Sequence, residues 1–328
     1  MLNLFFKYMV NKYDLKFPNA TEKEILDLNQ KQSTTIKQKL KCFVWKHPKI
    51  NYYCYEYIRK HKFVQKKHNN SLNHDTVFPD PNFMICGFPK CGTTSLWNYL
   101  GQHPQILSSA QKELHFFSYD YVSDLNLYKS YFPRISEKNE QNLLIFEASQ
   151  SYMIHPMAME RISKKYPKMK FIICLRNPVE QVFSAYNMSI INGFEIKSLE
   201  ECLNDEKNRH SLYIERVEKN LIKPYTYGYL TPYLHNAEYI THIKTALKYF
   251  PKENFLFIEN YDLKHNTQET VSNCFNFLNL DKIKIDPKIH NKGNYKKINK
   301  ELESRLSTHF VNYDIELNEL MDKKLSWL

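Results

Sequence analysis

The chain has 328 residues and a formal net charge of +11, from 46 lysines and arginines against 35 aspartates and glutamates. This length suits one large α/β domain with an extension. The seven cysteines include no Cys-x-x-Cys pair, which argues against a structural zinc site, and no stretch approaches the ~20 apolar residues of a transmembrane helix.

Residues 1–80 are expected to form a basic, aromatic-rich extension ahead of a domain at 81–328. Met1–Val10 is apolar, but it is short and interrupted by Lys7, so it is a poor signal sequence. Residues 37–67 carry ten lysines and arginines against one acidic residue, with aromatic side chains interleaved. Such a block binds a membrane surface or an acidic polymer, or it is a solvated surface helix. No nucleic-acid partner is expected.

Residues 83–95 are the most informative stretch. Phe83–Cys86 is a short apolar run that predicts a buried strand, and a loop bracketed by Gly87 and Gly92 follows it. The next residues predict a helix that begins with hydroxyl side chains: Thr93, Thr94 and Ser95. A strand, a glycine loop and a helix N-terminus together present backbone N–H groups to a phosphate.

The lysine of this loop is displaced. The glycine spacing matches the nucleotide-triphosphate loop G-x-x-x-x-G-K-[ST], but Thr93 stands where that loop has lysine, and the lysine is Lys90. This arrangement indicates a phosphate donor other than ATP.

Residues 87–94 instead fit the pattern G-x-P-K-x-G-T-[ST] at every position. They resemble the sulfotransferases that use 3′-phosphoadenosine 5′-phosphosulfate (PAPS), most closely the carbohydrate type that includes the heparan and chondroitin sulfate enzymes. The resemblance implies that Lys90 neutralises charge on the bridging oxygen of the donor. It also implies a set of contacts to the 5′-phosphosulfate: Lys90, Cys91, Gly92, Thr93, Thr94 and Ser95.

Lys112–Phe117 read K-E-L-H-F-F and match the family's K-E-x-H-F-F. The resemblance implies that Glu113 is the catalytic base, which removes the proton of the acceptor hydroxyl and typically contributes ~10²–10⁴-fold to the rate. In an extended segment His115 points to the same side as Glu113, where it orients the acceptor or shares the proton. The alternative for His115 is a structural histidine.

The next apolar run, at 143–147, predicts a strand that ends in Glu147, whose role the sequence leaves open. Residues 147–152 depart from the heparan group's E-K-[ST]-P-x-Y, because Ala148 replaces a lysine that belongs to the active site there. Other carbohydrate sulfotransferases have E-A-S in this place. The departure weighs against a second catalytic lysine and against a heparan-type acceptor.

Residues 170–175 predict another buried parallel strand, and Asn177 is a good N-cap for the helix that follows it. Arg176 therefore falls at the carboxyl end of a strand, where open α/β sheets bind ligands. The family holds the donor's 3′-phosphate on an Arg and on a Ser eight positions later, in the context L-R-[DN]-P-x-[ED]-R-x-x-S. Arg176 and Ser184 match these positions, whereas Gln181 stands where the family commonly has Arg.

Residues 290–295 resemble the late K-G-x-Y stretch that closes over the nucleotide in the heparan group. This implies donor contacts for Lys292 and Gly293, and the alternative is an ordinary polar loop. Residues 250–264 resemble a further family element that serves as core strand and turn.

Strands and helices alternate from residue 82 onward. Strands are predicted at 83–87, 143–147, 170–175 and 255–258, and helices at 93–102, 156–165, 178–190, 236–249, 267–279 and 299–322. The alternation predicts an α/β protein with a P-loop-like three-layer fold, in which helices flank a central parallel sheet.

The sequence thus predicts an enzyme that moves a sulfuryl group from PAPS to a hydroxyl on a carbohydrate, with an acidic glycan as one option. No metal is expected, because no acidic residue is placed like a Walker-B Asp. One alternative is a P-loop kinase or NTPase, and another is a non-catalytic polyanion-binding protein on a degenerate scaffold. The resemblance implies the Golgi or secretory pathway, but the lack of a convincing anchor leaves the cytoplasm open.

Overall fold

The structure is a computed structural model of the chain. It describes residues 76–119, 121, 125–136, 142–192, 194–219, 231–287 and 298–328. The basic block at 37–67 and the late loop with Lys292 and Gly293 lie outside the described residues. Their proposed contacts with a membrane or polyanion and with the donor stay predictions, as does the division of the chain at residue 80.

The core of the molecule is a parallel sheet of five strands in the order β3-β5-β2-β6-β7. In chain order the strands are β2 (Phe83–Gly87), β3 (Ile106–Ser108), β5 (Leu144–Ala148), β6 (Lys170–Leu175) and β7 (Phe255–Glu259). The predicted central parallel sheet is confirmed. A short antiparallel pair, β1 (Thr76–Val77) with β4 (Ile135–Ser136), forms a separate two-stranded sheet.

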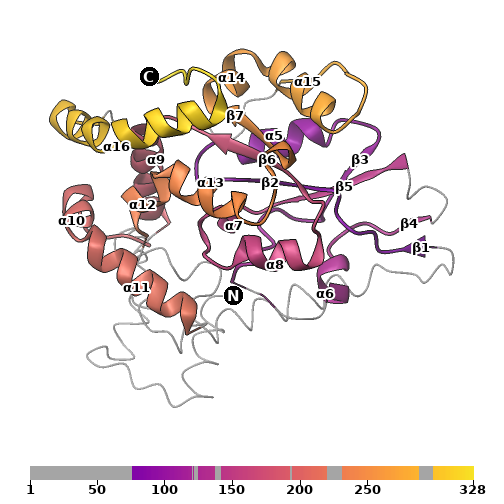
Figure 1. Cartoon of the computed structure of the whole chain (residues 1–328), viewed down its shortest axis with the longest axis horizontal. Coiled ribbons are helices and arrows are strands. Elements are labelled where there is room, and N and C mark those ends of the chain that lie inside the picture. Colours follow the sequence, from indigo (N-terminus) through magenta and orange to yellow (C-terminus); the bar gives the residue numbers. More distant parts are fainter. Residues whose placement is uncertain are drawn as a thin grey trace, which may run out of the picture.

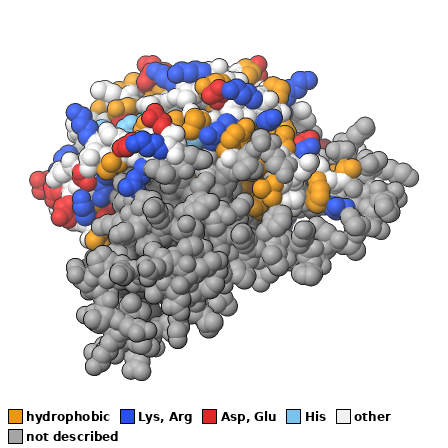
Figure 2. All heavy atoms as spheres, turned by 90° about the horizontal axis from the view of Figure 1, so that it is seen from below, with side chains coloured by type: hydrophobic (Ala, Val, Ile, Leu, Met, Phe, Trp, Pro, Cys, Tyr) orange, Lys and Arg blue, Asp and Glu red, His pale blue; other side chains and the backbone are white. Residues whose placement is uncertain are grey.

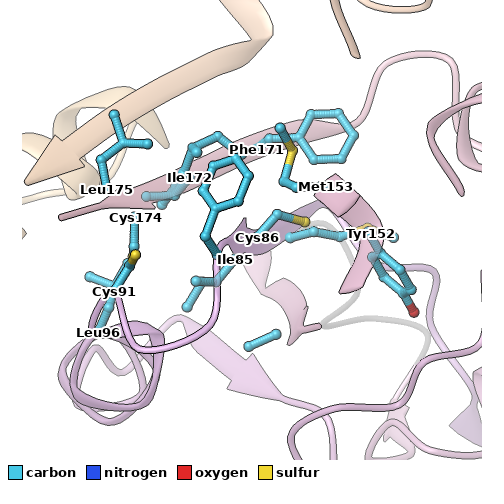
Figure 3. Close-up of a cluster of buried hydrophobic side chains, with 14 of the residues drawn as sticks. Ile85, Cys86, Cys91, Leu96, Tyr152, Met153, Phe171, Ile172, Cys174 and Leu175 are labelled. Carbon is cyan, nitrogen blue, oxygen red and sulfur yellow. The ribbon is translucent and has the colours of Figure 1, made fainter. Parts of the chain in front are cut away.

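The central strand β2 is buried along its whole length, and this explains its unbroken apolar sequence. Its register places Ile85 beside Ala148 on one side and Ile172 on the other. Figure 3 shows how Cys91, from the loop after β2, reaches toward Cys174 on β6. The loop is therefore packed directly onto the neighbouring strand.

The strand order creates a switch point between β2 and β6. From β2 the chain runs outward to β3 on one side, and from β6 it runs to β7 on the other. Because the connections leave in opposite directions, the carboxyl ends of these two strands are where an open α/β sheet of this kind binds ligands. The loop after β2 and Arg176 after β6 both lie at this edge.

Helices cover both faces of the sheet, as Figure 1 shows. On one side lie α5 (Thr93–Leu100) and α15 (Thr267–Phe277), and on the other lie α7 (Ser151–Ile154), α8 (Ala158–Lys165) and α13 (Tyr239–Leu247). The other helices are α6 (Leu125–Lys129), α9 (Pro178–Ile191), α10 (Leu199–Asn204), α11 (Glu206–Glu218), α12 (Tyr233–Ala237), α14 (Asn260–His265) and α16 (Lys300–Met321), with a 3₁₀ turn at Lys252–Asn254.

Most predicted elements are confirmed to within two residues at each end, and one is wrong. The helix predicted over 236–249 is broken at Glu238, which has φ −78° and ψ 64° and separates α12 from α13. The Glu238 carboxylate lies 3.1 Å from ring nitrogens of both His235 and His309. These contacts stabilise the non-helical conformation of Glu238. The sequence also left eight of the described helices and strands unpredicted, because they are too short or too polar for a clear period: β1, β3, β4, α6, α7, α10, α11 and α14.

On the described part of the face in Figure 2, basic and acidic side chains are interspersed and do not gather by sign. Among the described residues, no helix combines the length and the apolar character needed to cross a membrane.

Candidate active site

The two glycines that bracket the loop after β2 are required by its geometry. Gly87 has φ 125°, and a Cβ there would lie 2.7 Å from the carbonyl oxygen of Cys174. Gly92 has φ 100°, and a Cβ there would lie 2.6 Å from Nδ2 of Asn260. Any side chain at either position would therefore both strain the backbone and collide with a neighbour.

Helix α5 begins directly at the loop. Gly92 occupies its N-cap position, and no side chain caps the first turn. The first backbone N–H groups of a helix have no partner within the helix, so the N–H groups of Thr93, Thr94 and Ser95 suit an anion. The thiol of Cys91 instead faces the core, 3.6 Å from the Tyr239 hydroxyl, so Cys91 can contribute only its backbone to a ligand.

Arg176 interacts electrostatically with two lysines, Lys90 of the loop and Lys264. Burial and the nearby Arg176 guanidinium lower the pKa of the Lys90 ammonium. Partial burial and the same guanidinium lower the pKa of Lys264, which follows β7 on α14. Like charges that lower one another's pKa favour the binding of an anion beside them. The sequence predicts Lys90 and Arg176 as part of the site but does not indicate Lys264.

Arg176 and Ser184, the predicted 3′-phosphate pair, lie at the expected places. Nε and Nη2 of Arg176 lie 2.9 and 2.8 Å from Oε2 of Glu180, and Nη1 donates to the carbonyl oxygen of Lys90 at 3.3 Å. Ser184 is buried on α9, which begins as predicted with the Asn177 side chain accepting a backbone N–H at 2.9 Å. Arg176 thus joins the second strand end to the loop.

Glu113, the predicted base, is linked to the loop through a lysine. Its Oε1 accepts a hydrogen bond from Nζ of Lys112 at 2.8 Å, and its Oε2 accepts one from the N–H of Gln150 at 3.2 Å. Nζ of Lys112 also donates to Oγ1 of Thr93 at 3.0 Å. Lys112 therefore bridges the base and the start of α5. Although the family pattern contains this lysine, its position beside Glu113 in the sequence did not reveal the bridge.

The extended segment predicted around His115 is wrong, because Glu113 and His115 have φ 58° and 55°. The resulting turn lets the N–H of Glu113 donate to Ala148 at 2.8 Å and that of His115 donate to Oγ of Ser149 at 3.2 Å. Nε2 of His115 nevertheless lies 3.9 Å from Oε2 of Glu113, while its Nδ1 lies 2.7 Å from Oγ of Ser151. Burial lowers the pKa of His115.

Glu147 forms a buried support behind this turn. Its carboxylate accepts hydrogen bonds from the hydroxyls of Tyr128 at 2.6 Å, Tyr152 at 2.8 Å and Ser149 at 2.6 Å. Burial raises the pKa of Glu147 to about 7. Because Ser149 also accepts the N–H of His115, the acid stabilises the turn that carries the predicted base.

Backbone strain gathers at the same place. In the part of the chain that the structure describes, the non-glycine residues with positive φ are Lys90, Glu113, His115, Asn279 and Asp322. Three of these five are predicted catalytic residues. Such conformations cost of order 1–3 kcal/mol each, and they tend to cluster where function requires them.

Within the described segments, no group of three or more His, Cys, Asp or Glu side chains is arranged to hold a metal ion. The described cysteines are all free and buried: Cys86, Cys91, Cys174, Cys202 and Cys274.

The sheet, its switch point and the glycine loop define a P-loop-like α/β protein. The sulfotransferase domain family matches residues 80–324, and the chain belongs to this family. In the crystal structure of a sulfotransferase from Alicyclobacillus acidocaldarius the same fold recurs, with a TM-score of 0.62, 27% identity and coverage of 76% of this chain and 98% of that one.

Two curated relatives are similar over part of their length. The membrane-associated sulfotransferase kil1 of Dictyostelium discoideum is 23% identical over 75% of this chain and 66% of its own length. Heparan sulfate glucosamine 3-O-sulfotransferase 5 of Mus musculus is 28% identical over 63% of this chain and 56% of its own length. The chain thus spans less than two thirds of the length of either relative.

Proposed function

We propose that this chain is a sulfotransferase that moves the sulfuryl group of PAPS to a carbohydrate hydroxyl. The observation that carries the proposal is the Lys112 bridge, which joins Thr93 at the start of α5 to the carboxylate of Glu113. A group that can bind phosphate and a group that can remove a proton are thereby held in one site.

The donor is proposed to lie across the switch point. Its 5′-phosphosulfate contacts the loop and the start of α5 through Lys90, Thr93, Thr94 and Ser95, and its 3′-phosphate contacts Arg176 and Ser184. The basic group of Lys90, Arg176 and Lys264 supports this placement, because Arg176 bonds the loop and interacts with both lysines, which concentrates positive charge there. For the 3′-phosphate, Arg176 would exchange its pairing with the exposed Glu180 for the ligand.

In the proposed reaction, Glu113 removes the proton of the acceptor hydroxyl while the oxygen attacks sulfur. The bond between sulfur and the bridging oxygen breaks, and adenosine 3′,5′-bisphosphate leaves with the electron pair. Lys90 stabilises the charge that develops on the bridging oxygen. The contact of 3.9 Å between His115 and Glu113 supports a role for this histidine in orienting the acceptor.

The acceptor class rests on the relatives. One of them is named for sulfating heparan sulfate glucosamine, and this supports a glycan acceptor for this chain. Another is named as membrane-associated. A place on the secretory pathway is part of the proposal, with the cytoplasm as the alternative.

Calorimetric titration with adenosine 3′,5′-bisphosphate, in parallel with ATP and magnesium, tests the donor. We expect metal-independent binding of the bisphosphate in preference to ATP. A preference for magnesium-ATP would favour the kinase or NTPase alternative, and binding of neither would favour a non-catalytic scaffold.

A further inference from the structure

Three consecutive carbonyl groups of the loop after β2 are each held by a side chain from another element. The carbonyl oxygen of Pro89 accepts a hydrogen bond from Nε2 of Gln181 at 3.0 Å, and that of Cys91 accepts one from Nδ2 of Asn260 at 3.2 Å. Between them, the Lys90 carbonyl accepts the bond from Arg176. Gln181 comes from α9 and Asn260 from α14, so two distant parts of the chain hold one short loop.

These bonds fix the direction of the loop's N–H groups. In a trans peptide the C=O of one residue and the N–H of the next point in opposite directions, and the described chain has no cis peptide bond. Because α9 holds the carbonyl of Pro89 and α14 holds that of Cys91, the N–H of Lys90 points away from α9 and the N–H of Gly92 points away from α14. A phosphate bound by this type of loop needs N–H groups that are free of the surrounding elements and directed at it.

Folding stability does not explain the amide of Gln181. Its side chain is 1% exposed, and within the described structure its Oε1 is buried with no hydrogen-bond partner. An unsatisfied buried acceptor costs roughly 1–3 kcal/mol, which an apolar side chain of similar size would avoid. The feature that such a side chain lacks is the N–H donor that Gln181 directs at Pro89.

Asn260 also fits closely into its position beside the loop. Its Nδ2 occupies the space that a Cβ on Gly92 would enter, 2.6 Å away. The glycine and the amide are therefore complementary, because the absence of a side chain at 92 lets Asn260 reach the carbonyl of Cys91.

We infer that Gln181 and Asn260 are positioning residues, which hold the loop at residues 88–92 in the shape that receives the 5′-phosphate group of the donor. The inference rests on the proposed function. It assigns no contact with the ligand to either residue, since both act through the main chain of the loop.

The test compares Gln181→Met and Asn260→Leu with the unaltered protein. Both changes remove the donor and nearly keep the side-chain volume. The control is Gln102→Met, because the Gln102 amide also bonds a main-chain carbonyl, that of Asp286 at 3.1 Å, away from the loop. Each protein is titrated calorimetrically with adenosine 3′,5′-bisphosphate and with adenosine 3′-monophosphate, which lacks the 5′-phosphate.

We expect each loop variant to bind the bisphosphate about fivefold to tenfold more weakly, which corresponds to about one misplaced hydrogen bond to the 5′-phosphate. The affinity for the 3′-monophosphate should stay unchanged. The control variant binds both nucleotides like the unaltered protein. If one variant does not fold, the other decides alone.

Two results would overturn the inference while the proposed function stood: unchanged bisphosphate affinity in the variants, or equal weakening for both nucleotides, which indicates general damage. Failure of the unaltered protein to bind the bisphosphate would overturn the proposed function as well.

Discussion

The two walls of the candidate site are built in different ways. The donor wall, residues 87–95 with 176–184, presents backbone N–H groups and cations, and its key geometry comes from two glycines. The base wall, residues 112–115 with 147–151, is a chain of hydrogen-bonded side chains whose members come from two separate segments. The donor wall depends mainly on the conformation of the main chain, and the base wall depends mainly on a buried network of polar side chains.

The difference shows what each task requires. A phosphate is recognised by N–H groups at fixed angles, which a loop can supply, whereas proton removal requires one carboxylate in a controlled environment. Burial favours the neutral form in both walls, since it lowers the pKa of Lys90 and raises that of Glu147. The following changes separate the walls.

The largest effect is expected for Glu113→Gln in the base wall. Transfer should fall about 10³-fold, because the amide cannot take the acceptor proton, while bisphosphate affinity stays unchanged. Steady-state rates and calorimetry measure both quantities. Glu160→Gln, an exposed change on α8, is the control. A similar loss in donor affinity would show that the walls are not separate.

Lys90→Ala in the donor wall should lower the transfer rate by about 10²–10³-fold, since the charge on the departing oxygen is no longer neutralised. Bisphosphate binding should be retained in part through the N–H groups and Arg176. The control is Lys164→Ala, whose side chain is 67% exposed and pairs with Glu160. Transfer near the unaltered rate would contradict the proposed mechanism.

Glu147→Gln probes the network behind the base. Because the folded pKa of Glu147 is raised from 4.5 to about 7, its stabilising contribution is complete below pH 4.5 and is lost as the pH rises through 7. The shift corresponds to about 3 kcal/mol, so the stability difference between the two proteins should change by up to that amount. Urea unfolding at both ends of this range measures it, and a pH-independent difference would refute the assignment.

The smallest effect is expected for Arg176→Ala. Binding of adenosine 3′,5′-bisphosphate should weaken about tenfold, because the ligand contact replaces an existing pair with Glu180. Binding of adenosine 5′-monophosphate should weaken less, because it loses only the support that Arg176 gives to the Lys90 carbonyl. Competition calorimetry with the two nucleotides measures the ratio. Equal losses for both nucleotides would remove Arg176 from the 3′-phosphate site.

The same contrast explains how much the sequence revealed. The donor wall is largely contiguous, so Gly87, Lys90 and Gly92 could be predicted from their spacing, and the role of Arg176 could be predicted from the family resemblance of its segment. The conformation of Glu113 and His115 could not be predicted from the sequence, because it depends on carbonyl and hydroxyl partners at 148 and 149. The parallel sheet followed from the alternation of elements.

Other features depended on contacts between distant segments. Gln181 counted in the sequence only as a missing arginine, and its bond to Pro89 became visible only when α9 was placed against the loop. Asn260 lies 169 residues from the carbonyl that it holds, and no local pattern reports such a contact. The break at Glu238 likewise requires His309 from α16.

The left-handed backbone at Lys90 places thermal stability in conflict with the catalytic role that we propose for this lysine. With φ 70°, this position would suit glycine better, by roughly 1 kcal/mol, than any residue with a side chain. A laboratory selection for thermal tolerance alone would therefore favour Lys90→Gly, which stabilises the fold but removes the lysine that we propose neutralises the departing oxygen. The same pressure acts at Glu113, so a stabilisation campaign on this chain needs an activity screen in every round.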